Sequence, residues 1–207
     1  PLLGPSLRSP LPEGEEAIDA FRGLHILVQT LYLIRHTRPD IAPGLCYGQL
    51  DVGLSGSFVE EANHVLNWLP KLDLIISSPL LRTRKLAEFL ALMQHCKVRI
   101  DTRLMEKNFG VWEGRAWDDI ARHEIDAWTS DVMGYAPTGG ESAQQVMLRV
   151  QAFLQELTRL PQQNIALVAH GGSIRAILAQ LASIPLIDTL NWKIDYGAVI
   201  AVRIGRK

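Results

Sequence analysis

The sequence has few cysteines, almost no net charge and no long apolar run. Only two of its 207 residues are cysteines, Cys46 and Cys96, and they lie far apart without a C-x-x-C spacing. This pattern argues against a zinc knuckle or a disulfide framework and predicts two reduced thiols. A formal net charge of −1 argues against a protein that binds nucleic acid or an anionic membrane through bulk charge. An anion site must therefore be a local concentration of cations.

The apolar stretches are too short to predict a membrane helix. The longest, residues 24–34, is interrupted by His25, Gln29 and Thr30, whereas a membrane helix needs about 20 apolar residues. The first residues show no basic-then-apolar signal pattern, so we expect a cytoplasmic protein with no membrane partner. Apolar residues make up 47% of the chain and charged residues 21%, which is typical of a globular protein. A length of 207 residues suits one well-buried domain.

What the sequence does contain is an alternation of apolar strands and amphipathic helices. Apolar runs predict strands at residues 31–34, 72–76, 98–100, 165–169 and 198–204. Helix starts are predicted by capping boxes at Ser57 and Ser142 and by the pair Ser78-Pro79. Because strands and helices alternate, we expect an α/β fold, a three-layer αβα sandwich with a mostly parallel central sheet.

The first residues differ from the rest in composition. Residues 1–14 contain four prolines and two glycines, which predicts a flexible segment. We therefore divide the chain into an N-terminal arm, residues 1–29, and one globular domain, residues 30–207.

Two of the predicted strands end in a histidine. Arg35 and His36 follow the first strand, and His170 follows the strand at residues 165–169. An unpaired buried charge is costly, so these groups do not suit a core. The carboxyl ends of parallel strands form a ligand crevice, and the two histidines can meet there.

Further groups favour an anion at this edge of the sheet. Gly171 lets backbone amides at a helix N-terminus approach an anion closely. The first turns of another predicted helix carry Arg82, Arg84 and Lys85. Cations at a helix N-terminus oppose the helix dipole, so three of them indicate that an anion lies nearby. Phosphate is the obvious candidate, because its oxygens match the guanidinium fork.

These residues lie within five motifs whose order resembles that of the histidine phosphatase superfamily, which includes the cofactor-dependent phosphoglycerate mutases. The motifs are Arg35-His36-Thr37, Ser77-Ser78-Pro79-Leu80-x-Arg82, Glu106 followed by FGVWEG at 109–114, Gly140-Glu141-Ser142, and His170-Gly171-Gly172. The resemblance covers residues 30 to 204 and implies a phosphoglycerate-mutase-like catalytic domain at 30–207. It leaves the N-terminal arm unexplained.

The resemblance also implies catalytic roles. His36 is expected to be the nucleophile that forms a phosphohistidine, and His170 to contact the phosphoryl oxygens. Glu106 is expected to protonate the leaving alkoxide, with Glu113 or a carboxylate from another loop as the alternative. The expected phosphate-binding residues are Arg35, Arg82, Thr37, Gln49 and Gly171, although Thr37 and Gln49 could instead only shape the loop.

The expected chemistry is consistent with the charges. His36 attacks only as neutral imidazole, and adjacent guanidinium groups favour that form. The same cations stabilise the phosphoryl oxygens during transfer. We therefore expect no metal and no cofactor.

The substrate expectation rests on one branch of the family. Thr37 stands where many members have glycine, and no counterpart of an asparagine found in the mutases can be placed here. The segment Arg35-His36-Thr37-Arg38-Pro39, followed by Gly44-x-Cys46-Tyr47-Gly48-x-x-Asp51, most resembles α-ribazole phosphatases. Those enzymes remove the 5′-phosphate of α-ribazole phosphate during cobalamin assembly. We therefore expect a metal-independent phosphomonoesterase that acts on this small-molecule ester.

Two other functions are kept as alternatives. One is a broad-specificity phosphatase or a phosphoglycerate mutase-like enzyme. The other is an inactive member that binds a phosphate ester or a partner protein. The sequence leaves the oligomeric state open, a homodimer included, and predicts no nucleic-acid partner.

Overall fold

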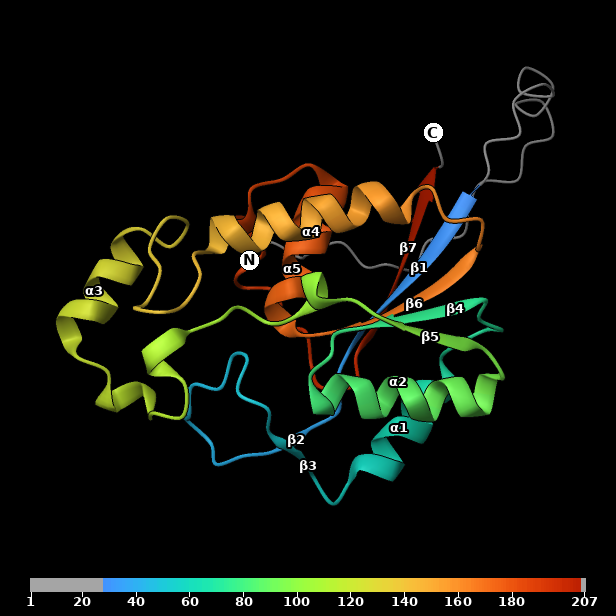
Figure 1. The fold of residues 1–207 in the computed structure, drawn as a ribbon, viewed down its shortest axis with the longest axis horizontal. Helices are drawn as coiled ribbons and strands as arrows, with labels where there is room; N and C mark the ends of the chain where they lie inside the picture. Colours follow the sequence, from blue (N-terminus) through green and yellow to red (C-terminus); the bar gives the residue numbers. More distant parts are fainter. Residues whose placement is uncertain (1–27, 206–207) are drawn as a thin grey trace, which may run out of the picture.

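Apolar segments along the chain form a central sheet in the computed structural model, which describes residues 28–205 (Figure 1). The strands are β1 (Val28–Arg35), β4 (Leu74–Ser77), β5 (Lys97–Ile100), β6 (Asn164–Ala169) and β7 (Val199–Gly205). Their order is β5-β4-β6-β1-β7, and every pair is parallel except β1 with β7. The arm predicted at residues 1–29 lies outside the described residues, apart from the two that begin β1.

The other elements connect these strands. The α-helices are α1 (Phe58–Asn67), α2 (Leu81–Gln94), α3 (Arg122–Ser130), α4 (Ala143–Leu157) and α5 (Gly171–Ala182). Short 3-10 helices are η3 (Thr102–Leu104), η4 (Gly110–Trp112), η5 (Trp117–Asp119) and η6 (Leu186–Thr189), and β2 (Pro39–Asp40) pairs with β3 (Gly53–Leu54). Within residues 28–205, no helix has both the length and the apolarity needed to cross a bilayer.

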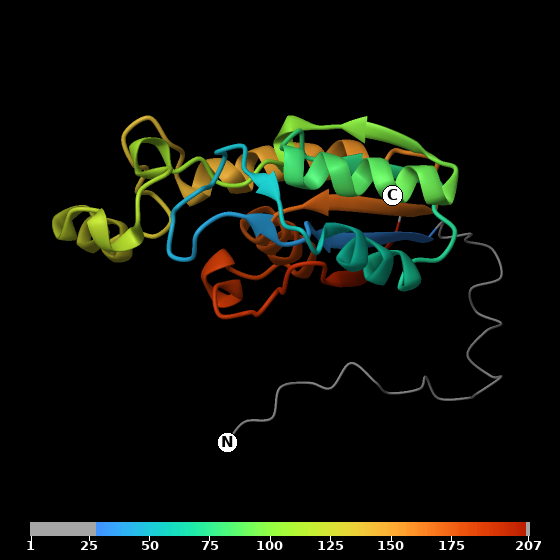
Figure 2. The same ribbon diagram turned by 90° about the horizontal axis from the view of Figure 1, so that it is seen from below.

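Helices cover both faces of the sheet because its central strands are apolar on both sides. In β1, Leu31 and Leu33 pack in a core with α4 and α5. Ile34 points to the other face and packs with α1 and α2, which both lie in front of the sheet in Figure 2, where the molecule is seen from below. The structure confirms the predicted α/β three-layer sandwich with a mostly parallel central sheet.

Two of the three predicted helix starts are correct in position, those at Ser57 and Ser142. Ser142 forms the capping box with Gln145 that the sequence predicts. Ser57 stands at the N-cap of α1 as predicted, but the predicted capping bond is absent, because its hydroxyl donates to the Glu61 carboxylate. The helix predicted to start at Ser78-Pro79 begins only at Leu81, and the Ser78 hydroxyl bonds a histidine from another strand.

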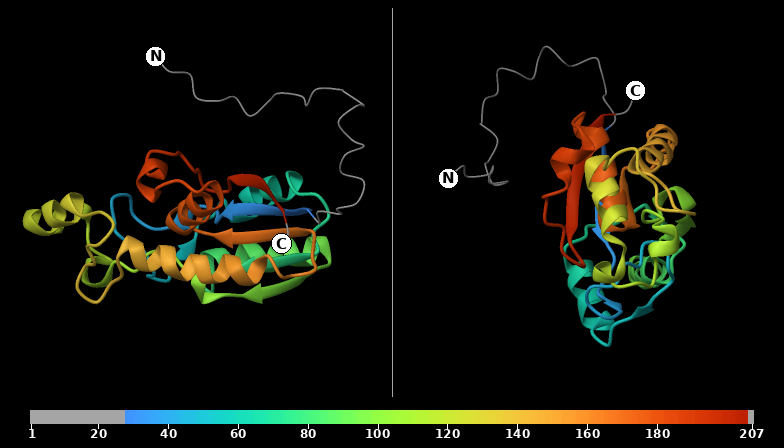
Figure 3. Two further views of the ribbon diagram at one scale, coloured as in Figure 1. Left: turned by 90° about the horizontal axis from the view of Figure 1, so that it is seen from above. Right: turned by 90° about the vertical axis from the view of Figure 1, so that its left-hand side faces the viewer.

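A separate segment, residues 108–141, extends beyond the carboxyl ends of the parallel strands (Figures 1 and 3). We call it the cap; it contains η4, η5 and α3. Trp112 and Ile120 form its buried apolar cluster together with Cys46, which belongs to the loop between β2 and β3. Of the five tryptophans, Trp112 is fully buried, Trp117 and Trp128 are half-buried in the cap, and Trp68 and Trp192 are exposed.

Candidate active site

The two predicted histidines lie side by side because β1 and β6 are neighbouring parallel strands. Arg35 pairs in register with Ala169, so the next residue of each strand is a histidine. The ring centroids of His36 and His170 are 5.1 Å apart, and both side chains are almost completely buried. The backbone amide of His36 also donates to the Ala169 carbonyl. The parallel register therefore fixes the position of both rings.

The surroundings of His36 set its protonation. Its Nδ1 lies 2.7 Å from the Thr37 carbonyl oxygen, so Nδ1 carries the proton and Nε2 keeps its lone pair. Burial lowers the pKa of this imidazole well below 6.5, the Arg82 and Arg35 charges lower it further, and the hydrogen bond to Thr37 opposes them. A neutral ring with a lone pair on Nε2 can attack an electrophilic phosphorus atom.

His170 has the complementary arrangement. Its Nε2 lies 2.8 Å from the Ser78 hydroxyl, which itself accepts a hydrogen bond from the Leu80 amide. Ser78 can therefore donate to Nε2, and the ring proton then lies on Nδ1. Burial lowers the pKa of His170 as well, and the neighbouring His36 ring and the Arg82 charge also oppose a positive charge on His170. His170 can thus act as a neutral hydrogen-bond donor.

Both predicted arginines are held by neutral backbone carbonyls. Arg35 donates through Nη1 to Ile194 at 2.6 Å. Arg82, which is 0% exposed, donates to Leu50 at 2.9 Å and to Gly48 at 2.6 Å. Because carbonyls carry no net charge, the positive charge of each guanidinium group remains available to an anion.

Polar atoms without a partner gather around His36. Arg35 Nε, Thr37 Oγ1, Arg82 Nε and His170 Nδ1 are all buried and make no hydrogen bond within the described residues. Buried polar atoms in folded proteins almost always have partners. All four groups can donate a hydrogen bond, so their natural partner is a ligand rich in acceptor oxygens.

Gly171, the remaining predicted phosphate-binding residue, lies where the cations meet. A side chain at this position would start 3.2 Å from Arg175 Nη1 and 3.7 Å from Arg35 Cζ. Gly171 is the first residue of α5, so the positive end of that helix faces the same region. The absence of a side chain thus lets the two guanidinium groups approach the helix N-terminus.

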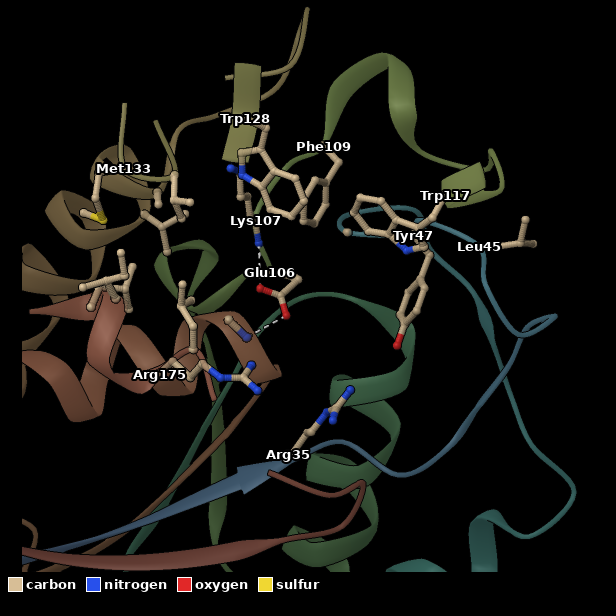
Figure 4. Close-up of a pocket in the computed structure, with 18 of the residues that line it drawn as sticks. Arg35, Leu45, Tyr47, Glu106, Lys107, Phe109, Trp117, Trp128, Met133 and Arg175 are labelled. Atoms are coloured by element: carbon tan, nitrogen blue, oxygen red, sulfur yellow. Dashed lines mark hydrogen bonds between the residues drawn. The ribbon is translucent and has the colours of Figure 1, made fainter. Parts of the chain in front are cut away.

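Glu106 lines the cavity and lies above Arg35 and Arg175 in Figure 4. Its carboxylate accepts hydrogen bonds from the amides of Lys107 and Gly172, both at 2.9 Å. Gly172 must lack a side chain, because a Cβ there would collide with this carboxylate. These bonds anchor the Glu106 carboxylate at the edge of the cavity.

Glu113 and Gln49 support the neighbouring loops. Glu113 accepts hydrogen bonds from the amides of Gln49 at 2.8 Å and Phe109 at 2.9 Å, and it does not line the cavity. The side chain of Gln49 donates to the Glu106 carbonyl at 2.9 Å. The structure thus gives Gln49 loop contacts, one of the two interpretations the sequence left open.

The cavity is larger than a phosphate ion and mostly apolar. It encloses about 330 Å³. The cap contributes Phe109, Trp117, Trp128 and Met133, and the segment around η6 contributes Leu186, Ile187 and Leu190. Figure 4 shows Phe109 and Trp128 above Lys107 and Glu106, with Arg35 on the opposite side. The polar groups therefore occupy one end, and aromatic and aliphatic side chains line the rest.

Sequence reasoning missed two cations that line this cavity. Arg175 donates to the carbonyls of Thr189 at 3.1 Å and Trp192 at 2.8 Å. It follows Gly171 by four residues on α5, a spacing that places both on one helix face and could have revealed it. Lys107 lies 5.4 Å from the Phe109 ring and 5.6 Å from the Trp128 ring, and burial lowers its pKa. Its irregular loop gives no comparable signal.

No group of three or more His, Cys, Asp or Glu side chains in residues 28–205 is arranged to bind a metal ion. The expectation of chemistry without a metal or cofactor stays a prediction.

Known proteins resemble the chain along most of its length. The model of the histidine phosphatase superfamily (branch 1) matches residues 31–207. The adenosylcobalamin/alpha-ribazole phosphatase of Escherichia coli is 31% identical, covering 86% of this chain and 91% of that protein.

Two solved structures share this three-layer fold, which confirms the predicted phosphoglycerate-mutase-like architecture. The alpha-ribazole phosphatase of Shigella flexneri aligns with a TM-score of 0.78 at 29% identity, over 84% of this chain and 89% of that one. A mycobacterial glucosyl-3-phosphoglycerate phosphatase aligns with a TM-score of 0.75 at 29% identity, over 85% and 90%. The named relatives are thus phosphatases that differ in substrate.

The lowered pKa values of His36 and His170 predict neutral rings in mildly acidic solution. We expect ¹⁵N NMR of the folded protein to show both rings neutral at pH 6, whereas in urea-unfolded protein they protonate near pH 6.5. The unfolded state then binds protons that the folded state does not, so the free energy of unfolding falls as the pH drops below about 6.5. Midpoints near 6.5 in the folded protein would contradict this assignment.

Proposed function

This chain belongs to the histidine phosphatase superfamily and is a phosphatase. We propose that it hydrolyses small phosphate esters through a phosphohistidine on His36. The observation that carries the proposal is the gathering of four buried, unpartnered polar atoms beside His36. Three phosphoryl oxygens can accept hydrogen bonds from this set. A phosphorus atom bound there would lie next to the ring that has a free lone pair on Nε2.

In the first step, the lone pair of His36 Nε2 forms a bond to phosphorus and the bond from phosphorus to the ester oxygen breaks. Glu106, in its protonated form, gives its proton to the departing oxygen. Arg35 and Arg82 stabilise the charge on the phosphoryl oxygens during transfer. The Thr37 carbonyl accepts from Nδ1–H and so stabilises the positive ring of the phosphohistidine.

In the second step, a water molecule attacks the phosphorus atom and the P–N bond breaks. Glu106, now a carboxylate, takes a proton from this water. Inorganic phosphate leaves, and His36 and Glu106 return to their starting protonation states. Two moderate displacements thus replace one difficult hydrolysis.

The walls of the cavity support α-ribazole 5′-phosphate as the substrate. The aromatic and aliphatic residues of the cap and η6 leave few polar atoms to pair with a strongly hydrated leaving group. An aromatic ring such as the benzimidazole of α-ribazole can pack against Trp128 and Phe109, and burying it there is favourable. The relatives named as alpha-ribazole phosphatases support the same substrate.

Two cations favour a second candidate, a phosphorylated sugar acid. Lys107 and Arg175 line the cavity beyond the two proposed clamp arginines, and either could bind a carboxylate. The similarity to a glucosyl-3-phosphoglycerate phosphatase supports this alternative. The cytoplasmic location and the homodimer stay predictions.

The role of Glu106 predicts a dependence on the leaving group. Glu106→Gln keeps the shape of the side chain and removes the acid, so we expect kcat for an alkyl phosphate to fall by about 10²- to 10⁴-fold. With p-nitrophenyl phosphate, whose leaving group needs no proton, kcat should change much less. Glu113→Gln is the matched control and should leave this selectivity unchanged. If Glu106→Gln slows both substrates equally, Glu106 is not the acid.

The substrate proposal predicts a preference among esters. With chelator present and His36→Ala as the blank, we expect α-ribazole 5′-phosphate to give the highest kcat/KM in a panel that includes glucosyl-3-phosphoglycerate, 3-phosphoglycerate and glycerol phosphate. Trp128→Leu should raise KM for the ribazole ester by about 5- to 50-fold, because stacking is lost, and should leave glycerol phosphate unaffected.

Lys107→Met separates the two substrate candidates, because it removes the charge and keeps most of the length. Little effect on the ribazole ester is expected. A preference for the sugar acid that Lys107→Met abolishes would overturn the ribazole proposal. Equal rates on all esters would indicate a broad-specificity phosphatase, and binding without turnover an inactive member.

A further inference from the structure

Two tyrosines from distant parts of the sequence meet beside the active site. Tyr47 lies in the loop between β2 and β3, and Tyr196 precedes β7. Their hydroxyl oxygens are 2.9 Å apart. For each hydroxyl, the other is the hydrogen-bond partner that the described residues provide. In Figure 4 the hydroxyl end of Tyr47 points toward the side of the cavity where Arg35 lies.

Each tyrosine ring also lies against one of the two arginines. Arg35 Cζ is 4.0 Å from the centroid of the Tyr196 ring, and Arg82 Cζ is 5.1 Å from that of Tyr47. The hydrogen bond between the hydroxyls therefore connects two arginine–tyrosine pairs. We call Tyr47 and Tyr196 the tyrosine bracket.

The backbone around Tyr196 is attached directly to the end of β1. The amide of Gly197 donates to the carbonyls of Arg35 at 3.2 Å and His36 at 3.1 Å, and the Arg35 amide donates to Ala198. The carbonyl of Ile194 accepts from the Arg35 guanidinium group. The antiparallel pairing of β7 with β1 thus brings both a carbonyl and an aromatic ring to Arg35.

Aromatic support suits an arginine that must bind an anion. Within residues 28–205, neither Arg35 nor Arg82 forms an ion pair with a carboxylate. A carboxylate would hold the guanidinium group but also cancel its charge. The face of a tyrosine ring attracts the cation through its quadrupole and carries no net charge. The arginine is then fixed in place while its full charge remains available to phosphate.

We propose that Tyr47 and Tyr196 are positioning residues, whose hydroxyl–hydroxyl bond fixes Arg35 and Arg82 relative to each other in the geometry that binds a phosphoryl group. This inference rests on the proposed role of the two arginines as the phosphate clamp. The bracket acts as one unit, because removing either hydroxyl breaks the one hydrogen bond that joins the two tyrosines. Burial and the bond to Tyr196 raise the pKa of Tyr47 to about 12, so the bridging hydroxyl keeps its proton in mildly alkaline solution as well.

The test is a double-mutant cycle read out by inhibition with orthovanadate, a phosphate-like anion that we expect to bind at the clamp. Tyr47→Phe and Tyr196→Phe each remove one hydroxyl and keep the ring. We expect each to raise the inhibition constant Ki by about 3- to 10-fold, the size of one hydrogen bond. The Ki of the double variant should be no higher than that of either single variant, because each single variant has already lost the same hydrogen bond.

Tyr32→Phe is the matched control, because it removes a hydroxyl from β1 four residues before His36 and should leave Ki unchanged. Tyr196→Leu also removes the ring under Arg35 and should raise Ki more than Tyr196→Phe. An unchanged Ki in both Phe variants, or effects that multiply in the double variant, would overturn the bracket. Thermal unfolding of each variant shows whether a change in Ki reflects loss of the fold.

Arg82→Lys separates failure of the bracket from failure of the clamp. A raised Ki in Arg82→Lys with normal Phe variants would refute the bracket alone. An unchanged Ki in Arg82→Lys would refute the clamp, and the bracket with it.

Discussion

The parallel pairing of β1 with β6 is the constraint on which the site depends. It places the residues after Arg35 and Ala169 side by side, and both are histidines. The strands are apolar on both faces, so burial against two helix layers fixes their register. The same burial removes water from both rings and keeps them neutral. The fold therefore supplies the position of the proposed nucleophile and also its reactive form.

A second constraint is how the cations are held. The chain has a net charge of only −1, yet Arg35, Arg82, Lys107 and Arg175 all line one cavity. Carbonyl groups hold three of them, the arginines, and aromatic rings lie beside both Arg35 and Arg82. These neutral supports leave the charge uncancelled. Strong attraction for a phosphoryl group is thus compatible with a nearly neutral protein.

Much of this arrangement could be predicted from local sequence signals. Apolar runs that end in Arg35-His36 and in His170 located the strands, the sheet edge and the histidines, because strand burial and polarity are local properties. The predicted start of α2 at Ser78-Pro79 was wrong, because the Ser78 hydroxyl bonds His170 and the helix begins only at Leu81. The bracket was not predictable, because Tyr47 and Tyr196 meet only through the pairing of β7 with β1. Tertiary contacts of this kind leave no local pattern in the sequence.

The most direct test of the account is to trap the covalent intermediate. Protein mixed with ³²P-labelled p-nitrophenyl phosphate and quenched in alkali within milliseconds should carry acid-labile, alkali-stable phosphate. Mass spectrometry should place it on His36, and His36→Ala should carry none. Normal turnover without any protein-bound phosphate, or phosphate bound to a residue other than His36, would contradict the account.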